Sequence, residues 1–155
     1  YFLPAPPQTV KFIIDDSAKD IEGKYAALYD PFSEELFYSD SNTPEISIDP
    51  GDGRLLQMCA TLPKKVEGKA EMNHLAILQG NITLEKKADV TVKSDCKLII
   101  KDNSKITVKK GAKLNIFGEV EIGDNVQIQV HKGGTIYLNE TDCKWGKNSK
   151  ISGEK

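Results

Sequence analysis

Short apolar pairs separated by one residue recur from Leu75 to Gly153, with turn-like spacers between them. Inside a pair the two apolar side chains point the same way, which is the period of a strand with one buried face. Every third pair repeats after 22 to 24 residues. The pairs therefore form three columns. The first residues of the pairs in each column are Leu75, Leu98, Val120 and Cys143; Ile82, Ile106, Ile128 and Ile151; and Val90, Leu114 and Ile136. The sequence therefore predicts a three-strand unit of about 23 residues.

Strands this short cannot bury an apolar face alone, and repeats of this length are typical of stacked arrays. In such an array each coil supplies one strand to each of several parallel sheets, and the members of a column lie about 4.8 Å apart. Spacers such as 109–113 are charged and contain Gly, Asn or Asp, which tolerate positive φ at corners. An antiparallel meander of hairpins also suits the spacing of the strands. The shortness of the strands favours the solenoid.

The segment Ile106-Thr-Val-Lys-Lys-Gly-Ala-Lys-Leu-Asn-Ile116 resembles the right-handed parallel β-helix repeats of secreted and cell-surface proteins. The resemblance covers about half of the chain, and its motif is not specific to one family. It implies an extracellular or bacterial-envelope location, in a group that includes adhesins, tail-spike-like proteins and polysaccharide lyases. A left-handed hexapeptide helix fits poorly because the columns do not step in sixes. Bactofilin-like polymers are a more distant match, because their Gly-rich corners are largely missing.

The first part of the chain has a different pattern, with short strands and most of the aromatic residues. Strands are predicted within 9–14, 24–29, 36–38, 45–48 and 54–62. Residues 15–20 are predicted to be a loop. A stack of coils ends in an open apolar cross-section, which a terminal unit must cover.

The predicted fold is therefore all-β, with a short right-handed three-sided parallel β-helix over residues 63–155. Residues 9–62 are expected to form a small β-sandwich-like cap, and residues 1–8 a Pro-rich leader. Residues 63–73 are expected to form an irregular first coil. The leader is compatible with a lipid anchor upstream, and no apolar run is long enough to span a membrane.

Charge is distributed unevenly along the chain. Residues 1–80 hold 7 basic and 13 acidic residues, whereas residues 81–155 hold 14 and 10. Arg54 is the only arginine. Because arginine is the preferred residue for bidentate phosphate and guanine recognition, nucleic acid is not expected as a partner.

One corner of the predicted solenoid is basic. The residues that follow the column of Ile82, Ile106 and Ile128 are Lys86, Lys87, Lys109, Lys110, His131 and Lys132. Stacked coils would turn them into a cationic ladder, whose summed field would bind an acidic glycan or another anionic surface. Such binding would weaken with salt. The alternative is that charged corners serve only solubility and prevent edge pairing.

No catalytic or cofactor-binding residue is predicted. His74 and His131 are the only histidines, and the motifs of nucleophile elbows, zinc hydrolases and phosphate loops are missing. The cysteines Cys59, Cys96 and Cys143 lack zinc-site spacing, and in the predicted register Cys96 and Cys143 are too far apart for a disulfide. They are expected to be idle or buried thiols.

Metal binding is not predicted either. Calcium is common in extracellular β-helices, and the acidic loops that could hold it contain Asp15, Asp16 and Asp20, or Asp49 and Asp52. Neither loop has the spacing of a calcium motif such as the EF-hand. Solvated turn carboxylates are the favoured interpretation.

These observations favour a non-enzymatic surface or secreted protein, structural or adhesive, that binds a surface glycan or a partner protein. A fragment of a polysaccharide-active lyase or hydrolase is one alternative, and a subunit of an envelope complex that docks through its solenoid edge is another. Residues 147–151 repeat the pattern of 102–106, and no cap-like sequence follows. This pattern predicts either that the natural protein continues or that another chain covers the C-terminal edge, for example by self-association.

Overall fold

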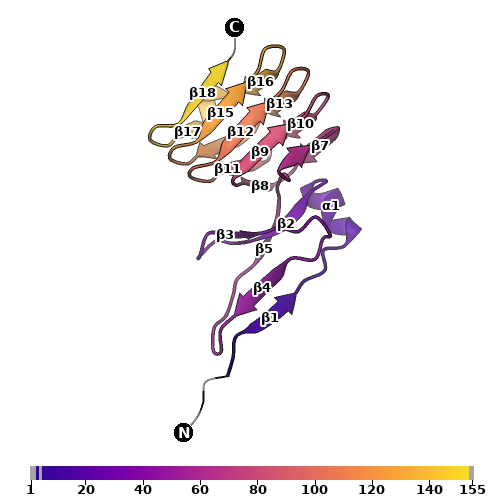
Figure 1. The fold of residues 1–155 in the computed structure, drawn as a ribbon, viewed down its shortest axis with the longest axis vertical. Helices are drawn as coiled ribbons and strands as arrows, with labels where there is room; N and C mark the ends of the chain where they lie inside the picture. Colours follow the sequence, from indigo (N-terminus) through magenta and orange to yellow (C-terminus); the bar gives the residue numbers. More distant parts are fainter. Residues whose placement is uncertain (1–2, 4, 154–155) are drawn as a thin grey trace.

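Parallel strands stack into a three-sided solenoid in the computed structural model of the chain, which describes residue 3 and residues 5–153 (Figure 1). One side consists of β7 (Lys69–Met72), β10 (Asp89–Val92), β13 (Lys113–Ile116) and β16 (Thr135–Leu138). A second side contains β8 (Leu75–Leu78), β11 (Lys97–Ile100), β14 (Glu119–Ile122) and β17 (Cys143–Trp145). The third consists of β6 (Lys65–Val66), β9 (Asn81–Leu84), β12 (Lys105–Val108), β15 (Gln127–Val130) and β18 (Lys150–Gly153). The predicted parallel solenoid is confirmed, and the antiparallel meander is excluded.

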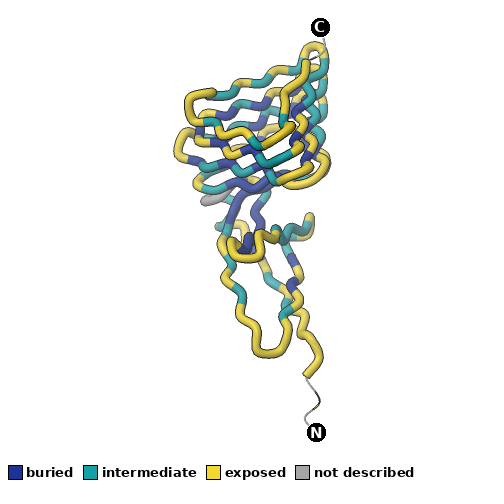
Figure 2. The backbone as a smooth tube through the Cα atoms, turned by 90° about the vertical axis from the view of Figure 1, so that its left-hand side faces the viewer, coloured by how far each residue is buried: buried dark blue, intermediate teal, exposed yellow. Residues whose placement is uncertain are grey.

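Two of the three predicted columns are confirmed residue by residue. Ile106 pairs with Ile82 on one side and with Ile128 on the other, and all three side chains are buried inside the solenoid. Leu114 pairs likewise with Val90 and with Ile136. Figure 2 shows the result as buried positions that alternate with more exposed ones along the coils.

The remaining predicted column, which starts at Leu75, is wrong at Leu75 itself. Leu98 pairs with Ala76 rather than with Leu75, so Ala76 and Leu78 face the solenoid interior. Leu75 and Ile77 face outward and pack against the N-terminal unit. The segment Leu75–Leu78 is apolar on both faces because both faces are covered, and alternation then cannot set the register.

The first coil is regular, contrary to the prediction for residues 63–73. β6 pairs with β9 and β7 pairs with β10, both in parallel. Val66, Ala70 and Met72 are buried and belong to the same core as the later coils. Ala and Met have no strong strand propensity, so their inward positions depend on the coil stacked above them.

The N-terminal unit extends one side of the solenoid. β5 (Gln57–Ala60) lies parallel to β8 and pairs with it at Ala60 and Ala76. β2 (Ala26–Asp30) pairs antiparallel with β5, and β3 (Glu35–Phe37) pairs antiparallel with β2. The result is a sheet of seven strands that runs through both parts of the chain.

A two-stranded ribbon of β1 (Gln8–Lys11) and β4 (Glu45–Ile48) accompanies this sheet. A cluster of Ile14, Ala26, Leu28 and Ile46 joins the two, which is the sandwich-like arrangement that was expected. Residues 16–22 form the helix α1 (Asp16–Glu22) and not the predicted loop. Asp15 caps it by accepting hydrogen bonds from the backbone N–H groups of Ser17 and Ala18, as short polar side chains do before a helix.

Asparagines stack along the corner between the β8–β17 and β6–β18 sides. Asn103, Asn125 and Asn148 all have φ between 56° and 60°, the left-handed region that Asn tolerates. Asn125 Nδ2 donates to Asn103 Oδ1 at 3.3 Å, and Asn148 Nδ2 donates to Asn125 Oδ1 at 3.3 Å. The repeated pattern of 102–106 and 147–151 is therefore a repeated corner.

At the C-terminal end, β16, β17 and β18 each pair on one side only within the described chain. Trp145 and Ile151 occupy inward positions of this last coil, yet they are 45% and 37% exposed. The expected association through this edge stays a prediction.

A buried carboxylate holds the β2–β3 turn together. Asp30 is 3% exposed and accepts hydrogen bonds from the backbone of Phe32 and Ser33 and from Arg54. Burial by itself would raise the pKa of Asp30, but these hydrogen bonds together lower it. The hydrogen bond from Arg54, at 2.6 Å, also lowers the pKa of Glu35.

Acid should therefore destabilise the N-terminal unit through this cluster. Carboxylates with lowered pKa values stabilise the fold above their ordinary pKa values of 3.8 and 4.5, and this contribution is lost as the pH falls through the folded-state pKa values. We expect Arg54→Gln to lower Tm by several degrees at neutral pH and by progressively less as the pH falls below 3.8, measured by circular dichroism. Lys19→Gln, which removes only an exposed pair with Asp16, should change Tm little over the same pH range. A difference between Arg54→Gln and wild type that is independent of pH would contradict this assignment.

Candidate functional site

The predicted cationic residues lie at the corner between the β6–β18 and β7–β16 sides, where three successive coils turn in the same way. The backbone N–H groups of Lys109 and His131 donate to the carbonyl groups of Leu84 and Val108, one coil below, at 3.1 and 2.9 Å. The third corner residue has a positive φ in each coil: 73° at Lys87, 79° at Gly111 and 83° at Gly133. The three corners are therefore in structural register.

This register places three lysines at the same position of successive coils: Lys86, Lys110 and Lys132. A Cβ atom built on Gly111 would lie 3.7 Å from Lys86 Cγ, and one built on Gly133 would lie 3.0 Å from Lys110 Cγ. Each of these two lysine stems thus lies across the glycine of the next coil. The three lysines form what we call the lysine row, with a spacing of about 4.8 Å between coils.

The other three predicted residues do not extend this row. Glu85, Lys109 and His131 occupy the preceding position, and Lys109 Nζ donates to both carboxylate oxygens of Glu85, at 2.9 and 2.7 Å. Lys87 lies one position further along, level with Gly111. Of the six residues of the predicted cationic ladder, three therefore form a single row beside the neutralised pair of Lys109 and Glu85. The prediction missed this because it left Glu85 out of the alignment of corners.

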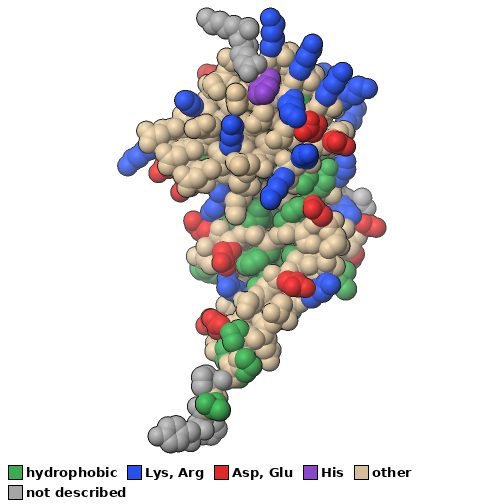
Figure 3. All heavy atoms as spheres, viewed as in Figure 1, with side chains coloured by type: hydrophobic (Ala, Val, Ile, Leu, Met, Phe, Trp, Pro, Cys, Tyr) green, Lys and Arg blue, Asp and Glu red, His purple; other side chains and the backbone are tan. Residues whose placement is uncertain are grey.

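The lysine row lies in a basic environment. Lys86 and Lys110 are exposed, and neither forms an ion pair with any residue in the described ranges. Lys113 follows at the start of β13 and is exposed too. Figure 3 shows lysine side chains gathered along this edge of the solenoid, at the right of the view.

An exposed aromatic pair lies on the outer face of the sheet that starts at this corner. The rings of Phe117 and Tyr137 have centroids 5.1 Å apart and are inclined by 40°, and they are 46% and 52% exposed. Tyr137 of β16 pairs laterally with Asn115 of β13. The pair lies about 15 Å from the lysine row along the strands. Nothing in the sequence analysis pointed to it, although Tyr137 stands at an outward position of its column.

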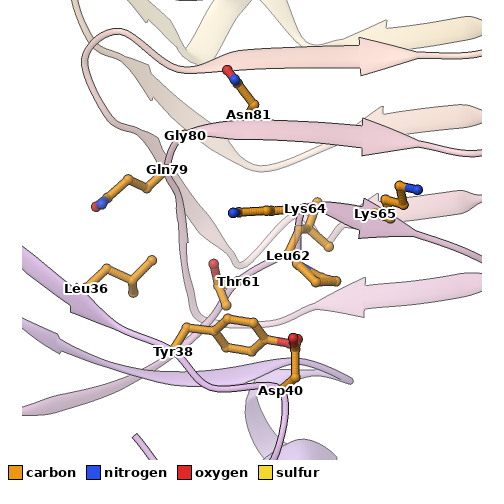
Figure 4. A pocket seen from close by; sticks show the side chains of 11 residues that line it. Leu36, Tyr38, Asp40, Thr61, Leu62, Lys64, Lys65, Gln79, Gly80 and Asn81 are labelled. Atoms are coloured by element: carbon orange, nitrogen blue, oxygen red, sulfur yellow. The ribbon is translucent and has the colours of Figure 1, made fainter. Parts of the chain in front are cut away.

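A pocket of about 790 Å³ lies where the N-terminal unit meets the first coils (Figure 4). Three segments far apart in the sequence line it: residues 36–40, residues 61–65 and the corner 79–81. Tyr38 donates its phenol hydrogen to Asp40 Oδ1 at 2.9 Å, and burial together with this carboxylate raises the pKa of Tyr38. Sequence analysis did not find the pocket, because its walls come together only through the pairing of β5 with β8.

The residues considered for metal binding are spread over ordinary turns. Asp15 caps α1, Asp16 lies 3.0 Å from Lys19 Nζ, and the side chain of Asp20 lies outside the described residues. Asp49 and Asp52 belong to one turn, in which Asp52 N donates to Asp49 O at 3.0 Å. Among the described side chains, no three His, Cys, Asp or Glu residues come together in a group that could hold a metal ion.

Of the three cysteines, Cys59 and Cys96 are buried and Cys143 is partly buried. Burial, followed by the nearby charge of Glu140, raises the pKa of Cys143. In the part of the chain that the structure describes, no helix has the length and apolar character needed to cross a membrane. No protein-family model matches the chain, and neither does any curated protein or solved structure.

Proposed function

We propose that the protein is a non-enzymatic, extracellular or cell-surface β-solenoid that binds an acidic polysaccharide along the lysine row. The observation that carries this proposal is the alignment of Lys86, Lys110 and Lys132 at one corner position of three successive coils. The resemblance of the repeats to those of secreted β-helix proteins supports the location.

The row suits a linear polyanion for a physical reason. Two unit charges about 4 Å apart in water attract each other by about 1 kcal/mol, which is weak for one contact. A rigid row repeats that contact without a further cost for ordering the backbone, so the contributions add. Exposed contacts of this kind are screened by salt.

The aromatic pair adds a second kind of contact on the same side of the solenoid. The C–H face of a pyranose is apolar, and it covers an exposed ring surface such as that of Phe117 or Tyr137. Asn115 lies beside Tyr137 and donates to Asp89 Oδ1 at 3.2 Å. Amide and carboxylate groups of this kind bind sugar hydroxyls.

A sugar polymer is a better candidate than nucleic acid. Arg54, the only arginine, lies in the N-terminal unit and binds Asp30 and Glu35. The corner offers lysine ammonium groups, which act as point charges and do not need a bidentate partner.

The test compares two double variants that change the net charge equally. Lys86→Gln/Lys110→Gln removes two members of the lysine row, whereas Lys105→Gln/Lys147→Gln removes two exposed lysines near the asparagine corner. Titration of polygalacturonate is monitored by isothermal calorimetry. At about 1 kcal/mol for each contact, the row variant should bind about 30-fold more weakly and the control variant within about threefold of wild type.

Raising the salt from about 0.05 M to about 0.5 M should weaken wild-type binding steeply. Equal losses in the two double variants, or binding that does not respond to salt, would contradict the proposal. Shortening of the polymer during incubation with the wild-type chain would instead support the polysaccharide-active enzyme.

A further inference from the structure

The pocket at the junction of the two parts has the size of a binding site and is separate from the lysine row. Small-molecule sites in proteins have volumes of roughly 300 to 1,000 Å³, and this pocket has about 790 Å³. One wall of the pocket, the segment 61–65, is bonded to the first coil of the solenoid. Thr61 is 2% exposed and donates its hydroxyl hydrogen to Ile77 O at 2.7 Å, which ties the 61–65 segment to β8.

The pocket combines an aromatic surface with a cation. The Tyr38 ring lies beneath Thr61 and Leu62 in Figure 4, and its hydroxyl group donates a hydrogen bond to Asp40. The Lys64 side chain extends above this ring toward the 79–81 corner, whereas the ammonium end of Lys65 points the opposite way (Figure 4). Within the described residues Lys64 has no carboxylate partner. An anionic group in the pocket would therefore meet an uncompensated charge.

The remaining polar groups restrict the kind of anion. Gln79 lies in the wall opposite the aromatic ring and offers an amide group, whereas the Asn81 side chain points away from the ring (Figure 4), and Asp40 offers a carboxylate. Phosphate groups are usually bound by free backbone N–H groups or by arginine. Here Gly80 N–H donates to Ser104 Oγ at 3.2 Å, and the lining residues include no arginine.

We propose that the junction pocket binds a single carboxylated sugar residue of the uronic acid type. The sugar carboxylate pairs with the Lys64 ammonium group, a charge-assisted contact. The C–H face of the ring packs on Tyr38, and the hydroxyl groups bind the amide of Gln79 and the carboxylate of Asp40. This site does not depend on polymer binding at the lysine row, because it lies at the corner between the β8–β17 and β6–β18 sides and shares no residue with the row.

The experiment titrates the full chain with galacturonate and, as a neutral match, with galactose. Two-dimensional ¹H–¹⁵N NMR spectra record the backbone amides. We expect galacturonate to shift the amides of Lys64, Gly80 and Asn81 with saturation, and galactose to bind about tenfold more weakly. Absence of shifts at these amides in tens of millimolar galacturonate would overturn the proposal, and so would equal binding of the two sugars.

Variants identify the groups that make the contact. Lys64→Gln should weaken galacturonate binding by about tenfold and leave galactose unchanged. Lys69→Gln, which replaces an exposed lysine of the first coil outside the pocket lining, is the matched control and should bind both as wild type does. Tyr38→Phe keeps the ring and should stay within about twofold of wild type. Unchanged binding by Lys64→Gln would overturn the site.

The lysine-row variant separates this proposal from the previous one. Lys86→Gln/Lys110→Gln should bind galacturonate as wild type does, even where it fails to bind the polymer. Loss of the monosaccharide in that variant would place the binding at the corner and overturn the pocket. Failure of polymer binding, with the shifts at Gly80 and Asn81 intact, would refute the lysine row alone.

Discussion

Replacing Ile106 with Ala should lower the free energy of unfolding by about 3 kcal/mol. The Ile106 side chain is completely buried and lies in line between Ile82 and Ile128, one coil below and one coil above. Shortening a large buried aliphatic side chain removes its own burial and leaves a cavity between its neighbours, which together cost about 2 to 5 kcal/mol. Urea denaturation monitored by circular dichroism measures the change.

Thr107→Ala on the same strand is the matched control. Thr107 faces outward, half-buried, and pairs with Thr83 and Gln129. Its loss should change the free energy of unfolding by less than about 1 kcal/mol. Equal effects of the two substitutions would show that the alternation of inward and outward residues is wrongly assigned.

Replacing Gly118 with Ala should have an effect at least as large, about 3 kcal/mol or more, for a different reason. Gly118 lies between β13 and β14, where an added Cβ atom would lie 2.0 Å from Cys96 O and 2.5 Å from Lys93 O. Both contacts are with backbone carbonyl groups of the coil below, so no side-chain rotation relieves them. The corner must move, and the pairing of β11 with β14 must move with it.

Gly53→Ala controls for the loss of glycine itself. No atom lies within 4 Å of the Cβ atom that alanine would add at Gly53, and neither Gly53 nor Gly118 has a φ in the left-handed region. The unfolded chain loses similar freedom in both variants, so any difference between them is steric. We expect Gly53→Ala to change Tm by little. A Gly118→Ala variant as stable as wild type would contradict the close stacking of corners.

Both effects depend on a feature of stacked coils, in which each coil contacts mainly its nearest neighbours. A defect at one coil therefore weakens the contacts on both of its sides. The same rigidity supports the proposed function, because the spacing of the lysine row is set by the hydrogen bonds between coils. An example is the bond from Gly111 N to Gly133 O, at 2.8 Å.

Much of the solenoid could be predicted from residues alone. Aliphatic residues recur at the positions of Ile106 and Leu114 in successive coils, because each short strand must place an apolar side chain against the inner wall of the stack. The asparagine corner was visible as the repeated pattern of 102–106 and 147–151, since only a few residue types accept a positive φ. The candidate cations were also visible, because corners after one column carry lysine in three coils.

The rest depended on contacts between distant segments. Leu75 was given an inward position because it resembles Leu98 in spacing, but the N-terminal unit covers the outer face of β8 and makes both faces apolar. Helix α1 was missed because a single turn-like run of polar residues does not show that Asp15 caps a helix.

The sequence by itself determined the period, the three-sided stack and the corners, because short strands with one apolar face can be buried only by their own repeats. The tertiary structure alone decided the register of β8 and the existence of the junction pocket. Each of these requires knowing which segments meet across the fold. The repeat identifies partners one coil away, but it carries no information about contacts between the solenoid and the N-terminal unit, which does not share the repeat.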